Sequence, residues 1–288
     1  MAIILITGCD GQLGNELKTV SRSYYGYDFI FTDINTLDIT NQEQTSEFIK
    51  QNSPDWIINC AAYNLVDKAE SEPEKAIIIN GTAVKNITEV IKGSECRFIH
   101  VSSDYVYDGK SNIPYNENIL PDPASAYGKS KLAGEKYALL HAGSMIIRTS
   151  WLYSSFGNNF VKTILRRAAE KETLNVVFDQ TGTPTYAADL ADAIMGIISG
   201  VIRNQMAMTS GIFNYSNEGV CTWYDFASEI VKESGLTCKI QPVLSKDFHQ
   251  VAQRPSYSVM DKSKIKESYG LSIPHWRTSL LKCMKLLK

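Results

Sequence analysis

Short apolar runs alternate with helical stretches along much of the chain. The run Ile3-Ile4-Leu5-Ile6 is continuous and rich in β-branched residues, which is typical of a strand buried in a parallel sheet. Similar runs occupy 28–32, 55–60, 97–102, 144–149 and 174–178, with a return strand at 211–216, and helical segments such as 12–21, 41–51, 74–92 and 125–141 lie between them. This alternation predicts an α/β fold with a Rossmann-type, doubly wound parallel sheet and right-handed crossovers.

The pattern loosens after about residue 150, where long loops rich in aromatic and amide residues begin. We expect a dinucleotide-binding domain over 1–150, with a return segment near 174–216. A smaller C-terminal substrate-binding domain is expected from 151–173 and 217–288. The chain therefore crosses between the two domains more than once.

The composition is typical of a soluble enzyme. The chain has 288 residues, 44% of them hydrophobic, and a net charge of −2, which gives no basic surface for nucleic acid. No segment approaches the ~20 apolar residues of a membrane-spanning helix. The six cysteines lack Cys-x-x-Cys spacing and indicate reduced thiols, and the four histidines have no metal-ligand spacing. We expect a cytoplasmic protein with no nucleic-acid partner and no membrane partner.

A glycine cluster follows the first apolar run. Gly8, Gly11 and Gly14 are spaced three residues apart, and the helix-like segment 12–21 begins among them. A loop of this kind lets backbone N–H groups and the positive end of a helix face a phosphate. The same pattern also occurs in ordinary tight turns, but its position between a strand and a helix favours a dinucleotide pyrophosphate.

A carboxylate should follow about 20 residues later to accept hydrogen bonds from the adenosine ribose. Asp33 lies 19 residues after Gly14, at the end of the second apolar run. Asp38, followed by Ile39, is a second acidic candidate, suited to the adenine amino group. Because Asp33 would repel a 2′-phosphate, and because Cys9-Asp10 holds no basic residue, the sequence favours NADH over NADPH.

A second cluster lies about ninety residues downstream. The strand-like run 97–101 delivers Ser102 and Ser103, and Tyr127 is followed one helical turn later by Lys131. Residues four apart share a helix face. The same spacing also occurs in pairs of solvated residues on a helix surface, which is the alternative interpretation. A phenol beside an ammonium and a nicotinamide would ionise more readily and could act as a general acid or base. A serine hydroxyl could hold the carbonyl oxygen of a substrate.

These residues resemble the extended short-chain dehydrogenase/reductases, and more closely the dTDP-4-dehydrorhamnose reductase family. The similar segments run along most of the chain and include 11–14, 37–40, 60–63, 66–70, 101–109, 127–135, 148–153, 157–161, 179–185, 222–227 and 254–258.

The resemblance implies roles for individual residues. The catalytic set would be Ser103, Tyr127 and Lys131, with Asp104 and Trp151 contacting the sugar nucleotide and Asn64, Val66 and Tyr105 lining its site. Ala61, Ala62 and Tyr63 would border the cofactor. The full cofactor set would be Gly8, Gly11, Gln12, Leu13, Gly14, Asp33, Asp38, Ile39, Ala61, Ala62, Tyr63, Tyr127 and Lys131.

The chain departs from the family pattern at several positions. Ser103 stands where relatives often have Thr, and Asn214 stands where a His is common. Some relatives hold a dimer-bridging magnesium with glutamates. Glu16 is present, but Ala188 stands where a second carboxylate would be expected, so we predict no metal. The resemblance is compatible with a homodimer.

The resemblance implies reduction of the 4-keto group of a dTDP-6-deoxy-hexose, dTDP-4-dehydrorhamnose to dTDP-rhamnose, with NADH or NADPH. An epimerase or dehydratase of the same fold is an alternative, although Tyr105 stands where dehydratases commonly have a second acid. A non-catalytic regulatory subunit is a further alternative, and such proteins often lose the Tyr/Lys set. Trp151 could also be core packing after a strand, although the resemblance favours a ligand contact. The aromatic series Trp223, Tyr224 and Phe226 indicates core, and Arg254 is either a surface group or a phosphate ligand.

Overall fold

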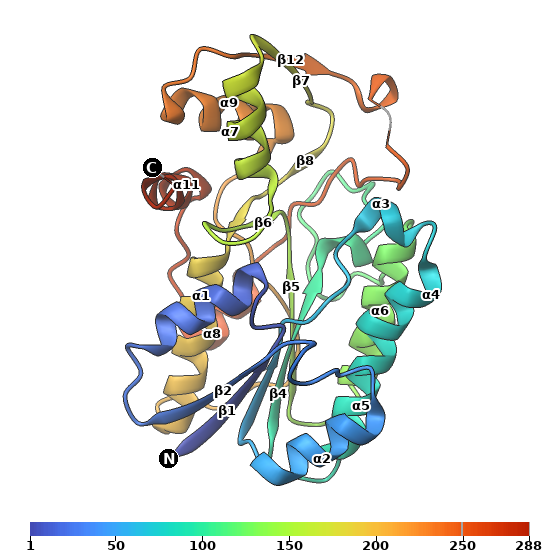
Figure 1. Ribbon diagram of the computed structural model, residues 1–288, viewed down its shortest axis with the longest axis vertical. Helices are drawn as coiled ribbons and strands as arrows, with labels where there is room; N and C mark the ends of the chain where they lie inside the picture. Colours follow the sequence, from blue (N-terminus) through green and yellow to red (C-terminus); the bar gives the residue numbers. More distant parts are fainter. Residues whose placement is uncertain (249, 288) are drawn as a thin grey trace.

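Six parallel strands form the centre of the computed structural model, which describes residues 1–248 and 250–287 (Figure 1). The order across the sheet is β10 (Gly211–Asn214), β5 (Ser144–Thr149), β4 (Arg97–Ser103), β3 (Trp56–Asn59), β1 (Ala2–Thr7) and β2 (Tyr27–Thr32). After β2 the chain crosses back over β1 to form β3, so the direction of winding reverses there. This is the predicted doubly wound Rossmann-type sheet, in which ligands bind beyond the carboxyl ends of the strands at the reversal.

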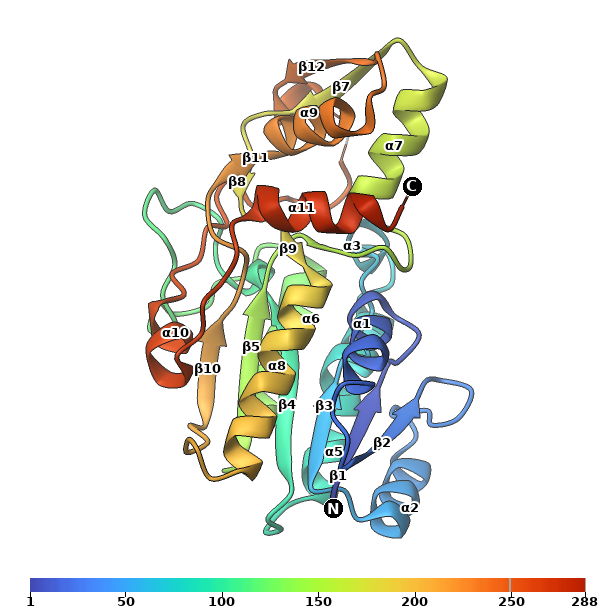
Figure 2. The same ribbon diagram turned by 90° about the vertical axis from the view of Figure 1, so that its left-hand side faces the viewer.

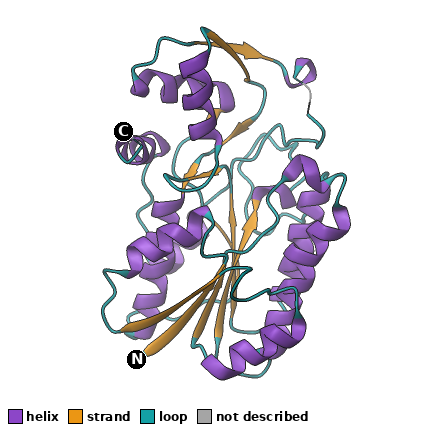
Figure 3. Cartoon of the chain, in the orientation of Figure 1, coloured by secondary structure: helices purple, strands orange, loops and turns teal. Residues whose placement is uncertain are grey.

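Helices cover both faces of this sheet (Figures 1 and 3). One layer contains α1 (Gln12–Ser21) and α8 (Ala187–Ile202), and the other contains α2 (Gln42–Asn52), α5 (Ala83–Val90) and α6 (Ala126–Ala138). Ile4 and Ile6 pack in the core on the α1/α8 side, whereas Leu5 packs on the opposite side. Because successive strand residues face opposite ways, a strand buried on both faces must be continuously apolar, as the sequence indicated.

The helix expected at 74–92 is interrupted. The chain forms α4 (Pro73–Ile77), a π-helical turn η1 (Ile78–Thr82) and then α5, after the short α3 (Val66–Ala69). The side chain of Asn80 in this turn accepts from the Tyr63 backbone N–H at 2.8 Å and donates to Ser130 Oγ at 2.8 Å. The π-turn therefore directs a buried amide toward the loop that holds Tyr63 and toward α6.

A smaller unit lies beyond the carboxyl ends of the central strands (Figure 2). Its core is formed by residues of α7 (Phe160–Glu170), α9 (Trp223–Ser234) and α11 (Trp276–Lys285). Short strand pairs also form outside the central sheet: β6 (Leu152–Tyr153) with β9 (Thr185–Tyr186), β7 (Thr173–Val177) with β12 (Lys239–Val243), and β8 (Thr181–Gly182) with β11 (Cys221–Thr222). The other short helical segments of the fold are η2 (Asp104–Val106), η3 (Ser245–Asp247) and α10 (Ser263–Tyr269).

The strand expected at 174–178 forms, but not in the central sheet. Its counterpart β7 pairs with β12 in the smaller unit, so the chain rejoins the central layers only at α8 and then at β10, which is parallel to β5. Apolar alternation identifies a strand without specifying its partner, which explains the difference. The division into 1–150 with a return segment, and 151–173 with 217–288, stays a prediction, and within it His249 and Lys288 lie outside the described residues.

The six cysteines are all free thiols, and all but Cys60 are buried. Within the described ranges, no helix has both the length and the apolar character needed to cross a membrane.

Candidate active site

The glycine loop between β1 and α1 is too tightly packed for side chains. A Cβ on Gly8, whose φ is +68°, would lie 2.5 Å from the Ala61 backbone nitrogen, and one on Gly14 would lie 2.4 Å from the Gly8 carbonyl oxygen. Gly11 caps α1 without a side-chain hydrogen bond, so no side chain covers the first N–H groups of this helix. The first turn of α1 thus presents backbone N–H groups at the positive end of a helix, which fits a pyrophosphate.

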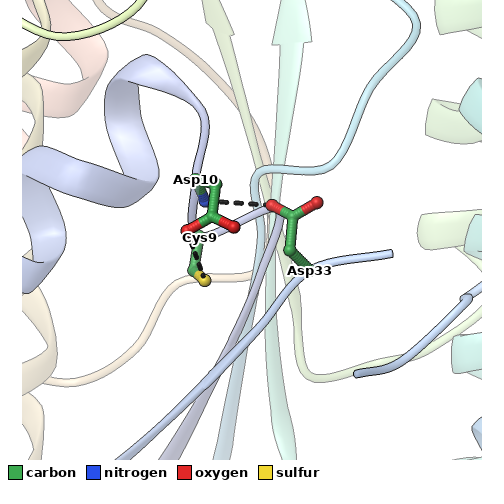
Figure 4. Close-up of side chains that lie close together, drawn as sticks. All are labelled: Cys9, Asp10 and Asp33. Atoms are coloured by element: carbon green, nitrogen blue, oxygen red, sulfur yellow. Dashed lines mark hydrogen bonds between the residues drawn. The ribbon is translucent and has the colours of Figure 1, made fainter. Parts of the chain in front are cut away.

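Asp33 lies beside this loop, at the carboxyl end of β2 (Figure 4). Its carboxylate accepts from the backbone N–H of Asp10 at 2.9 Å and from that of Ile34 at 2.8 Å. The Cys9 thiol donates to Asp10 Oδ1 at 3.5 Å, and Lys18 Nζ forms an ion pair with the same oxygen at 2.7 Å. Lys18 was not predicted at this loop, because its position two turns along α1 does not reveal that its side chain reaches back to Asp10.

A cavity of about 560 Å³ connects the glycine loop with the ends of β4 and β5. It brings together residues that lie far apart in the sequence. The expected site residues that line it are Gly8, Gly11, Gln12, Leu13, Gly14, Ala62, Asn64, Val66, Ser103, Asp104, Tyr105, Tyr127, Lys131 and Trp151.

Five expected cofactor residues do not line this cavity: Asp33, Asp38, Ile39, Ala61 and Tyr63. Asp38 accepts from the backbone and hydroxyl of Thr40, and the side chain of Ile39 is buried in the core. The ring of Tyr63 is also buried, and its hydroxyl donates to Glu72 at 3.0 Å. A dinucleotide long enough to pass Asp33 would extend beyond the cavity, so a ribose or adenine contact at Asp33 or Asp38 stays a prediction.

Ser103, Tyr127 and Lys131 meet on the floor of the cavity, each less than a tenth exposed. Ser103 ends β4, whereas Tyr127 and Lys131 lie one turn apart on α6, which begins at the Ser125 cap. The Tyr127 hydroxyl donates to Asn64 Oδ1 at 3.4 Å, and Lys131 Nζ donates to the Val101 carbonyl at 2.6 Å. The structure therefore brings the three residues predicted as the catalytic set together at one cavity.

The surroundings of Tyr127 in the structure disfavour ionisation of its phenol. Burial raises the pKa of Tyr127, opposed mainly by a hydrogen bond with Ser103. Lys131 makes its hydrogen bond to Val101 and not to the phenol, so its charge is not directed at Tyr127. Burial also lowers the pKa of Lys131 to about 8. The phenol is consequently held in its protonated form.

Asp104 and Tyr105 follow Ser103 directly. Ser103 Oγ donates to Asp104 Oδ1 at 2.9 Å, and burial raises the pKa of Asp104 to about 7. The ring of Tyr105 packs edge-on against Tyr127 with centroids 5.3 Å apart. These two side chains form the wall of the cavity next to the phenol.

Trp223 and Arg254 also line the cavity, although the sequence placed the first in the core and left the role of the second undecided. Trp223, expected in the core, lines the cavity and also packs against Phe226. Arg254 lines the cavity as well, donating to the Tyr105 hydroxyl at 3.1 Å and pairing with Asp67 at 2.6 Å. For Arg254, a phosphate ligand was one of the two interpretations that the sequence offered. For Trp223, helical spacing alone does not distinguish an aromatic residue in the core from one at a cavity wall.

The family model described as RmlD substrate binding domain matches residues 1–288. A Bacillus subtilis relative named spore coat polysaccharide biosynthesis protein SpsK is 38% identical over 281 residues, covering 97% of this chain and 96% of that protein. A dTDP-4-dehydrorhamnose reductase from Aggregatibacter actinomycetemcomitans is 37% identical over 287 residues, covering 97% of each. A crystal structure of the Bacillus anthracis dTDP-4-dehydrorhamnose reductase in complex with NADP superposes with a TM-score of 0.93 at 36% identity, covering 99% of both chains.

Proposed function

The chain belongs to the RmlD substrate binding domain family, and we propose that it reduces the 4-keto group of dTDP-4-dehydrorhamnose to give dTDP-rhamnose. The observation that carries this proposal is the single cavity in which the glycine loop faces Ser103, Tyr127 and Lys131. A loop for a dinucleotide and a proton donor meet there, as reduction of a carbonyl requires.

The cofactor we propose is a nicotinamide dinucleotide, held by the glycine loop at its pyrophosphate and by Asp33 at its adenosine ribose. When bound, it supplies the hydride that reduces the ketone. The fit rests on Gly8 and Gly14, which leave no room for side chains, and on the uncapped start of α1. Asp33 favours the two ribose hydroxyls of NADH, whereas Lys18 beside Asp10 gives the loop a cation that a 2′-phosphate would also attract. We infer that NADH is used at least as well as NADPH.

In the proposed mechanism, Tyr127 donates its phenolic proton to the ketone oxygen as that oxygen gains negative charge. Ser103 Oγ, which donates to Asp104 Oδ1 in the structure, would turn to donate a hydrogen bond to the same oxygen and hold it within reach of the phenol. Lys131 would turn its ammonium toward the phenol and the cofactor ribose, which favours the phenolate that remains. Burial of all three groups strengthens these interactions because little water competes with them.

The substrate would lie against Asn64, Val66, Asp104, Tyr105 and Trp151. The Arg254 guanidinium faces the same cavity, and its planar charge suits a diphosphate. A dehydratase is disfavoured at this site, because the residue after Asp104 is Tyr105, whose hydroxyl accepts from Arg254. A second carboxylic acid beside the catalytic hydroxyl is therefore missing from this position.

The test is conversion by the purified protein of dTDP-4-dehydrorhamnose in the presence of NADH or NADPH. We expect oxidation of the cofactor with an equal amount of dTDP-rhamnose, identified by NMR spectroscopy and mass spectrometry. dTDP-glucose serves as the control for dehydratase activity and should stay unchanged. A folded protein that oxidises neither cofactor with the keto-sugar would contradict the proposal.

A further inference from the structure

A buried ion pair lies beneath the floor of the cavity. Arg148, near the end of β5, and Glu135, on α6, are 0% and 1% exposed. Arg148 Nε and Nη2 donate to Glu135 Oε1 and Oε2 at 2.8 and 2.6 Å. Neither residue lines the cavity. Burying two charges costs desolvation free energy, and replacing a buried ion pair by apolar residues often leaves a protein equally stable. Stability of the fold alone therefore does not explain this pair.

Glu135 lies one helical turn after Lys131 on α6. Residues four apart on a helix are neighbours, and a carboxylate at this spacing attracts an ammonium. Burial strengthens the attraction because the surroundings screen it less than water does. In the part of the chain that the structure describes, Lys131 nevertheless forms no ion pair with Glu135, and its Nζ donates to the Val101 carbonyl at 2.6 Å.

The carboxylate of Glu135 already accepts three hydrogen bonds from other donors. Ser102 Oγ donates to Oε1 at 2.6 Å, and the two Arg148 donors occupy Oε1 and Oε2. The guanidinium also lies 4.8 Å from the centre of the Tyr107 ring, which fixes its orientation. A guanidinium stays charged at any ordinary pH, so its hold on Glu135 does not depend on a proton.

We propose that Arg148 is a positioning residue that keeps Glu135 from capturing the Lys131 ammonium and so leaves Lys131 free to act beside Tyr127. The inference rests on the proposed reductase function, in which Lys131 turns toward the phenol and the cofactor ribose. Neither Arg148 nor Glu135 lines the cavity, so the pair would act through the residues it holds and not by touching the substrate.

The electrostatic surroundings of Lys131 agree with this role. The titratable groups that face it are Cys60 at the end of β3, His100 on β4, and Tyr127 and Glu135 on its own helix. Burial lowers the pKa of Lys131 to about 8, and Glu135 is the main group that opposes this. Without the charge of Arg148, Glu135 would act on Lys131 unbalanced and would raise its pKa.

The decisive comparison uses three variants. Arg148→Met removes the cation at similar length, and we expect kcat to fall about tenfold to a hundredfold, as a part of the effect of general acid–base catalysis. Arg148→Lys retains a cation against Glu135 and should keep kcat within about threefold of the wild type. The double variant Arg148→Met/Glu135→Gln removes both charges, so Lys131 is free again and kcat should recover to a similar level.

Two further readouts separate positioning from mere support of the fold. In the protein without cofactor, labelling of Lys131 by an amine-reactive reagent across a pH series, read by mass spectrometry, should need higher pH in Arg148→Met than in the wild type. The double variant also lacks the carboxylate that raises the pKa of Lys131, so its labelling should need a pH no higher than in the wild type. A purely structural ion pair would lower the melting temperature of Arg148→Met but change neither the labelling profile nor the kcat of the folded enzyme.

The proposal is overturned if folded Arg148→Met keeps wild-type kcat, or if the double variant is as slow as Arg148→Met. Should Arg148→Met fail to fold, Arg148→Gln, which retains a neutral donor to Glu135, takes its place with the same expectations. Failure of the proposed function is recognised separately, because the wild type itself would then not reduce the keto-sugar. The labelling comparison needs no turnover and still tests the capture of Lys131.

Discussion

The indole rings of Trp151 and Trp223 lie face to face, with centroids 3.5 Å apart and planes 7° from parallel. Trp151 follows β5 and Trp223 begins α9, so the stack joins the central sheet to the smaller unit at the cavity wall. Trp151 has a φ of +47°, which is unusual for a bulky residue and marks local strain. Gly182 makes room for the ring, since a Cβ there would lie 2.7 Å from it.

We predict that Trp151→Ala weakens binding of a dTDP-sugar by roughly 1–3 kcal/mol through lost stacking and apolar contact. Affinity for NADH should stay nearly constant, because the glycine loop holds the dinucleotide at the other side of the cavity. Calorimetric titration with each ligand separates the two sites, and Trp223→Ala is the matched variant for the other ring of the stack. Equal losses for both ligands would mean that Trp151 supports the fold instead of the substrate.

Cofactor preference tests the role of Asp33. Its carboxylate should bind the ribose hydroxyls of NADH and disfavour a 2′-phosphate, so kcat/KM for NADH should equal or exceed that for NADPH. Lys18→Ala should reduce the use of NADPH more than that of NADH, because Lys18 neutralises Asp10 in the loop. Steady-state kinetics with both cofactors decide the matter. A preference for NADPH above about tenfold would contradict the argument from the Asp33 carboxylate.

The stability of the protein should carry a pH dependence from Asp104. Because burial raises its pKa to about 7 from 3.8, the folded state retains the proton that the unfolded state loses between these values. This contribution is complete below the unfolded pKa and is lost as pH rises through the folded one, by at most about 1.4 kcal/mol per pH unit. Asp104→Asn should therefore gain stability relative to wild type as pH rises from about 4 to 7.

Denaturant unfolding across that pH range measures the effect of Asp104→Asn. Asp108→Asn serves as a control of opposite sign, since the hydrogen bond from Tyr115 lowers the pKa of Asp108 and stabilises its ionised form. In a series extended below about pH 4, that variant should lose stability relative to wild type as pH rises toward the usual carboxyl pKa, and it should then change little from about 4 to 7. A stability difference for Asp104→Asn that does not change with pH would contradict a raised pKa at Asp104.

Ser103→Ala should slow turnover on the order of 10²-fold, as for loss of one donor to a developing oxyanion, and less than removal of the phenolic proton. Ser103→Thr keeps the hydroxyl and should retain most activity. The measurement is kcat with saturating cofactor and keto-sugar. A greater loss in Ser103→Ala than in Tyr127→Phe would place the main proton donor elsewhere.

The sequence specified the parts of the fold that depend on local pattern. Continuous apolar strands and the helices between them follow from residue type and spacing. It misplaced the strand at 174–178, because the choice of β12 as its partner depends on a segment more than sixty residues away. It also missed the π-turn at Asn80, whose amide hydrogen bonds form only once Tyr63 and Ser130 are brought together.

The candidate site follows the same rule. The glycine spacing and the single turn between Tyr127 and Lys131 are local, so the sequence identified residues that the cavity then brings together. Lys18 on α1 and Trp223 on α9 also lie near the site. Their positions depend on how these helices pack, which no local sequence pattern predicts. The ion pair between Arg148 and Glu135 is likewise a tertiary feature, since β5 supplies one charge and α6 the other.

The central claim is that Tyr127 supplies the proton while the ketone is reduced in this cavity. Tyr127→Phe removes the phenolic hydroxyl but keeps the ring that packs against Tyr105. In the reductase assay with dTDP-4-dehydrorhamnose, we expect turnover of Tyr127→Phe to fall by on the order of 10²–10⁴, with the Kd for NADH little changed. Reduction of the keto-sugar by purified Tyr127→Phe at the wild-type rate would contradict the account.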